Sequence, residues 1–160
     1  MADEVKWDNL KEALNLLGSE FTAELANQLM TAGKDASGNL INSLSFEVLE
    51  DVKGLLLDVK AAYYLKFVDE GRAPGKYPNI GAIKEWVGQR GITMQNATED
   101  QTAFVIARSI KENGIRPTNV IENTINIIMS TKADILKVAA REDVSILMNG
   151  VVADINKSMR

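Results

Sequence analysis

Residues 44–61 read LSFEVLEDVKGLLLDVKA, two short runs in which apolar and polar side chains alternate on either side of a turn. The apolar positions of the two runs are Leu44, Phe46 and Val48, then Leu55, Leu57, Val59 and Ala61. Asp51–Gly54 has the composition of a turn between strands. The stretch therefore predicts an antiparallel β-hairpin with one apolar face, which helices should cover from a single side.

Before the hairpin, apolar residues recur at steps of three and four, which predicts a helix from about Asp8 to about Ala32. Its stripe consists of Trp7, Leu10, Leu14, Leu17, Phe21, Leu25 and Leu29. Gly33 is expected to end this helix. The polar stretch Gly33–Asn39 that follows is expected to be a loop.

After the hairpin the pattern favours a short helix over Tyr63–Val68, although this run could also extend the sheet. It stops at Gly71, and the two prolines and the glycine of Arg72–Pro78 predict a well-defined loop. We expect Asn79 to cap the next helix, which ends at Gly91. The stripe of that helix is Ile80, Ile83, Trp86 and Val87, which predicts that Trp86 lies in the core.

Thr98 and Gln101 have the spacing of a capping box and predict a further helix that ends at Gly114. Three residues of this helix, Phe104, Ala107 and Ile110, are expected to face inward. Beyond Pro117, apolar residues continue at helical spacing to the C-terminal end. This region is expected to be one long helix, or two helices broken near Glu142 or Gly150.

The fold class predicted for the whole chain is α+β, with an N-terminal helix, a small antiparallel sheet built on a hairpin, helices on one face and a long C-terminal helical region. With 160 residues, 46% hydrophobic and 25% charged, the composition is that of one folded domain. Within residues 1–160 we expect an N-terminal helix and loop (1–36), an α+β core (37–130) and a C-terminal helical extension (131–160).

The chain has no cysteine and no histidine, which excludes a thiol nucleophile, an imidazole base and the usual zinc sites. We expect no cofactor and no metal. The acidic start lacks the features of a signal peptide, and no run of about 20 apolar residues predicts a membrane span. Net charge is −4, with −7 in residues 1–51, +2 in 52–130 and +1 in 131–160.

Two classes of function stay open on these residues alone. A small nucleic-acid-binding protein would use Arg72, Lys76, Lys84 and Arg90, which lie among Tyr77 and Trp86, to hold phosphate and stack bases. A metal-dependent hydrolase, the weaker possibility, would have to be built from carboxylates. Its adjacent acidic pairs do not share a helix face and are more typical of a solvated surface.

Three segments, taken in order, resemble the tail-completion or head-tail joining (neck) proteins of tailed bacteriophages. They are Ser37–Leu40 with Asn42–Leu44 before the hairpin, Tyr63–Arg72 after it, and Gly114–Thr118 before the last helices. The similarity covers roughly Ser37 to Ile128. Pro74–Pro78 and Trp86 agree with a subgroup of the family that has a helical insertion here.

The resemblance implies a structural virion protein without catalysis, made in the host cytoplasm and located in the neck or tail. It implies a sixfold or twelvefold ring of identical chains between the portal or connector and the tail, with DNA passing only transiently through the lumen. Charge supports such a contact, since the acidic N-terminal helix would face the mildly basic middle of a neighbour. The candidate interface residues are Tyr64, Phe67, Glu70, Arg72, Pro74, Lys76, Tyr77, Pro78, Pro117 and Ile127.

Overall fold

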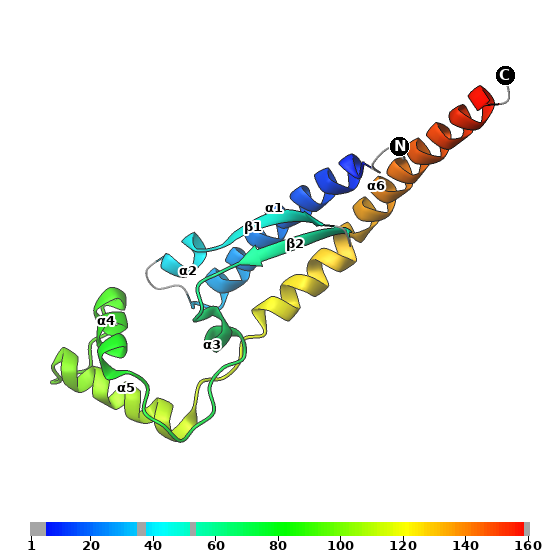
Figure 1. The fold of residues 1–160 in the computed structure, drawn as a ribbon. Coiled ribbons are helices and arrows are strands. Elements are labelled where there is room, and N and C mark those ends of the chain that lie inside the picture. The colour runs from blue at the N-terminus through cyan, green and yellow to red at the C-terminus, as the bar shows by residue number, and fades with distance from the viewer. Residues whose placement is uncertain (1–5, 35–37, 52–53, 159–160) are drawn as a thin grey trace. The chain divides into compact units, whose positions relative to one another are not determined.

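The computed structural model describes residues 6–34, 38–51 and 54–158 (Figure 1). Its elements are α1 (Asp8–Thr31), α2 (Asn39–Asn42), β1 (Ser45–Asp51), β2 (Gly54–Lys60), α3 (Leu65–Asp69), α4 (Ile80–Arg90), α5 (Glu99–Asn113) and α6 (Val120–Ser158). The α+β class predicted from the sequence is confirmed. The chain divides into two compact units: unit 1 comprises residues 1–24, 45–60 and 123–160, and unit 2 comprises residues 25–44 and 61–122.

The hairpin of unit 1 is antiparallel, as the alternation of residues 44–61 predicts. Phe46 pairs with Val59 and Val48 with Leu57, so these apolar side chains share one face. That face packs on α1 at Gly18, where an added Cβ would lie 2.3 Å from the Phe46 ring. Glycine at this position therefore lets the sheet approach the helix closely. The centre of the predicted turn, residues 52 and 53, lies outside the described residues.

Helices α1 and α6 run antiparallel in unit 1. Asp143 accepts hydrogen bonds from Asn9 near the start of α1, whereas Lys132 pairs with Glu20 further along α1 at 3.1 Å. The apolar core between these elements includes Ala13, Leu17, Ile128 and Ala139, all buried. Of the two possibilities for the C-terminal region, the structure has one helix, which passes both Glu142 and Gly150 without a break.

Unit 2 contains two helices whose ends follow local sequence signals. Asn79 Oδ1 accepts from the backbone N of Ala82 at 3.2 Å, which caps α4. At the start of α5, Thr98 N donates to Gln101 Oε1 at 2.9 Å and Gln101 N donates to Thr98 Oγ1 at 3.3 Å. The predicted capping box is confirmed. The short helix near Tyr64 is also present, as α3.

Two aromatic residues that we expected inside are on the surface of unit 2. Trp86 is 37% exposed and Phe104 is 48% exposed, so the prediction of a core tryptophan and an inward phenylalanine was wrong. The buried residues of α4 and α5 are smaller: Val87, Thr102, Ala103 and Ala107. Because small side chains fill the interior of this helix pair, the large rings lie on its outer side.

Candidate interaction surfaces

Two segments distant in sequence meet in unit 2, at the base of the α4–α5 pair. Arg72 N donates to the carbonyl of Ile115 at 2.9 Å, and Ile115 N donates to the carbonyl of Arg72 at 2.8 Å. Each partner is preceded by a glycine, and Gly71 and Gly114 have φ of 74° and 72°. A Cβ at Gly71 would lie 2.4 Å from the Ile115 carbonyl oxygen, so both conformation and space require glycine here.

The same junction starts α6. The Asp69 carbonyl accepts from the N–H groups of Thr118 at 3.0 Å and Asn119 at 3.1 Å, and Asp69 Oδ1 accepts from Ile121 N at 2.9 Å. Thr118 Oγ1 donates to the carbonyl of Val68 at 2.7 Å. Exposed Pro117 lies within this crossing. Segments 68–72 and 114–121 therefore have a structural role. Their hydrogen bonds join the chain before α4 to the chain after α5, and they cap the start of α6.

The loop Arg72–Pro78 is held against α5. The Arg72 guanidinium donates to the carbonyls of Lys76 and Tyr77, each at 3.1 Å, and Gly75 N donates to the Lys111 carbonyl at 2.8 Å. Pro74 and Lys76 are exposed and Pro78 is half-buried. The structure thus brings the predicted loop candidates together beside α5, while the Arg72 side chain is used in shaping the loop.

An aromatic–cationic face, defined by Tyr77, Phe104, Arg108 and Lys111, lies where this loop meets α5. The Tyr77 and Phe104 rings are stacked with centroids 6.2 Å apart, and Lys111 Nζ lies 4.5 Å from the Tyr77 ring centroid. Arg108 pairs with Glu112 at 2.9 Å, and this pair, with a smaller contribution from Tyr77, raises the pKa of the Arg108 guanidinium. The face combines exposed rings with cations.

Three other predicted interface residues lie in α3 or directly beside it in sequence, and a fourth lies in unit 1. Tyr64 is half-buried, with its ring edge-on to Tyr63, and Phe67 is 52% exposed. Glu70 is exposed and pairs with Lys66 at 3.8 Å. Ile127, on α6, is 38% exposed.

The basic residues proposed for nucleic-acid binding are largely engaged within the chain. Lys84 pairs with Asp100 at 2.7 Å, which raises the pKa of the lysine. Arg90 donates to the Gly33 carbonyl, and Arg72 donates within its loop. Of the four, Lys76 alone has no hydrogen bond or ion pair from its side chain in the described part of the chain. Of the four charges, that of Lys84 alone is balanced by an ion pair in the described part of the chain.

Unit 1 contains an open groove of about 560 Å³ between α1 and α6. The groove is lined by five apolar residues, Ala13, Leu16, Ile135, Val138 and Ala139, and by three carboxylates, Glu12, Asp134 and Glu142. We call this the acidic groove. The periodicity of the sequence does not predict this groove, because its residues come from two helices more than 100 positions apart. Exposed Leu16, outside the predicted stripe, was its one local signal.

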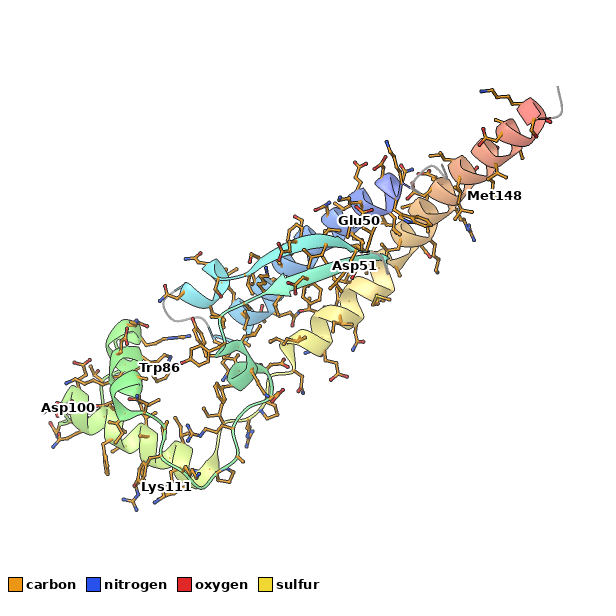
Figure 2. The ribbon with its side chains drawn as sticks, viewed as in Figure 1. Glu50, Asp51, Trp86, Asp100, Lys111 and Met148 are labelled. Atoms are coloured by element: carbon orange, nitrogen blue, oxygen red, sulfur yellow. The ribbon has the colours of Figure 1, made fainter. Side chains whose placement is uncertain are left out.

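The last part of α6 carries a second apolar surface, within the C-terminal helical region whose apolar residues continue at helical spacing beyond Pro117. Asp143 lies against the start of α1, so the 15 residues 144–158 continue for about 22 Å past that point at 1.5 Å per residue (Figures 1 and 2). This C-terminal apolar face, exposed by 38–56%, consists of Val144, Leu147, Met148, Val151 and Val152. Its residues span an arc of about 140° around the helix.

Among residues 6–34, 38–51 and 54–158, no three acidic side chains gather into a metal site. Within the same ranges, no helix is both long and apolar enough to cross a lipid bilayer. Comparison of the chain with protein-family models, with curated proteins and with solved structures finds no match.

Proposed function

We propose that this chain is a structural virion protein of a tailed phage, without catalysis. In this role it forms a ring at the head–tail junction, as a neck or tail-completion component that joins the portal or connector to the tail. It is made in the host cytoplasm and resides in the virion, and DNA meets the ring only in passing through its lumen.

The observation that carries an assembly role is the C-terminal apolar face of α6. Five apolar side chains lie on one arc of a helix that continues beyond the start of α1, and each of them is at least 38% exposed. Apolar surface of this kind on a soluble protein marks a contact with another protein. A helix with one apolar stripe gains most of its stability by packing that stripe against a partner.

The sequence segments that resemble neck proteins support the proposal in a different way. Residues of two of these segments, Tyr63–Arg72 and Gly114–Thr118, build the crossing at Arg72 and Ile115 and the cap of α6 at Asp69. The resembling stretch Pro74–Pro78 contributes Tyr77 to the aromatic–cationic face.

Substitution of two residues in the C-terminal apolar face tests the proposed assembly role. In Leu147→Gln/Val151→Gln, ring assembly should be lost, because the new amides lose hydrogen bonds with water when the face is covered. Light scattering after size exclusion measures the mass. Asn149→Gln, on the polar side of the same helix, is the control and should assemble like the wild type. Equal assembly of the double variant would contradict the role given to this face.

A further inference from the structure

We propose that copies of this chain associate head to tail, with the aromatic–cationic face of one copy seated in the acidic groove of the next. This inference deepens the proposed ring and rests on it, because it names the two surfaces that neighbouring copies use. The occupant of the groove is therefore a second copy of the chain.

The groove offers both apolar and negatively charged lining residues. Leu16 and Val138, two of the apolar ones, are 47% and 53% exposed, so they are available to a partner's side chains. Asp134 pairs with Lys137 at 2.8 Å on its own helix. Glu12 and Glu142 form no ion pair among the described residues. A groove between two antiparallel helices accepts the ridge of a third helix, here one that carries apolar residues beside cations.

Helix α5 presents such a ridge. Phe104 and Val105 are 48% and 47% exposed, and Arg108 and Lys111 follow Phe104 at helical spacing on the same side. Arg108 is already paired with Glu112. The cations here that form no ion pair in the described part of the chain are Lys111 and, in the adjoining loop, exposed Lys76. Seated in the groove, the two apolar side chains would cover Leu16 and Val138 while the cations meet Glu12 and Glu142.

The charges of the two units agree with this pairing. Unit 1 has 9 basic and 14 acidic residues, a net charge of −5, whereas unit 2 has 9 basic and 8 acidic residues, a net charge of +1. An acidic groove facing another acidic groove would be repelled, so a two-fold contact of like surfaces is disfavoured. A contact between two different surfaces is heterologous, and repetition of such a contact closes into a ring when its rotation allows.

Reciprocal charge reversal tests the contact. Glu12→Lys/Glu142→Lys reverses the groove, and Arg108→Glu/Lys111→Glu reverses the face. Each double variant alone should lose assembly, because it brings like charges together. An equal mixture should recover assemblies that contain both variants, since each reversed groove meets a reversed face. Light scattering measures the recovery, and circular dichroism confirms that each variant is folded. Unchanged assembly of either variant, or no recovery on mixing, overturns the contact.

Disulfide trapping decides the contact even when it is weak, because the chain has no cysteine of its own. A mixture of Leu16→Cys and Phe104→Cys should yield a covalent heterodimer under oxidation. A mixture of Asn126→Cys and Phe104→Cys should not, because exposed Asn126 lies on the opposite side of α6 from the groove. No heterodimer in the first mixture, or equal amounts in both, overturns the inference.

The two proposals fail in different ways. A wild-type chain that stays monomeric throughout would overturn the ring, whereas the trapping result would still decide the docking contact. If the wild type forms a ring, the charge-reversed variants assemble equally well and no heterodimer is trapped, the proposed function stands and this contact alone is overturned.

Discussion

Asp143 is a carboxylate that is 3% exposed and caps a helix far away in sequence. Its Oδ1 accepts from the Asn9 side chain at 2.8 Å and the Asn9 backbone at 3.2 Å, and Oδ2 accepts from Leu10 N at 2.9 Å. These backbone donors belong to the first turn of α1, where N–H groups have no hydrogen-bond acceptor within their own helix. Burial alone would raise the pKa of Asp143, but the hydrogen bonds outweigh burial and lower it.

Removal of this cap should destabilise unit 1. We expect Asp143→Ala to lower the free energy of unfolding by about 2 kcal/mol, since it leaves buried donors without an acceptor. Urea unfolding followed by circular dichroism measures the loss. Asp154→Ala, an exposed residue on the same helix, should change stability by less than about 0.5 kcal/mol. Equal effects would show that Asp143 is not a cap.

The lowered pKa of Asp143 also predicts a dependence on pH. The unfolded chain binds this proton more tightly, at a pKa of about 3.9, so acid favours unfolding. The advantage of the wild type over Asp143→Asn should therefore be constant above about pH 5. It should shrink as the pH falls through the lower pKa of the folded state. A gap that widens on acidification would contradict the assigned hydrogen bonds.

Both the backbone conformation and the lack of space at position 71 require glycine. In Gly71→Ala, the new Cβ would meet the Ile115 carbonyl oxygen in a backbone conformation that alanine disfavours. We expect a loss of at least about 2 kcal/mol in urea unfolding. Gly91→Ala is the matched control, because Gly91 also has φ in the left-handed region, at 61°, but has open space around it. Its loss should be smaller, about 1 kcal/mol.

At the scale of single elements, signals contained within a few residues predicted the structure well. The caps of α4 at Asn79 and α5 at Thr98 depend on side chains three residues from their partners, so the sequence alone specifies them. The alternation of residues 44–61 likewise determined the hairpin. Helix α2 was not predicted, because four residues are too few to show a period.

The outward position of Phe104 could not be read from spacing, because it depends on which neighbours fill the interior of the α4–α5 pair. Ala103 and Ala107 do so, and both are fully buried. The cap at Asp143 and the acidic groove were missed for a related reason. Both join the start of α1 to the second half of α6, and no local pattern records that pairing.

The continuity of α6 through Gly150 gives a prediction for this element. Glycine inside a helix costs about 0.5–1 kcal/mol relative to alanine, and a Cβ at Gly150 meets nothing within 4 Å. Gly150→Ala should therefore slow amide exchange across residues 146–154, as mass spectrometry can measure. Unchanged exchange would mean that this part of α6 is not helical in the free chain.

At the scale of the whole molecule, three surfaces stay open on the described chain: the acidic groove, the aromatic–cationic face and the C-terminal apolar face. The first two are complementary in charge, and the third is apolar. We infer a division of roles, with the charged pair setting which copies meet and the apolar face supplying most of the stability. High salt should therefore slow assembly more than it weakens rings already formed.

If the chain acts by assembling into a ring, as we propose, its mass in solution should show it. Light scattering after size exclusion, over a wide range of protein concentration and with negative-stain images of the large species, is the measurement. We expect a discrete mass of six or twelve times 17.5 kDa, and closed rings in the images. A monomer at every concentration, still monomeric in the presence of portal or tail proteins, would contradict it.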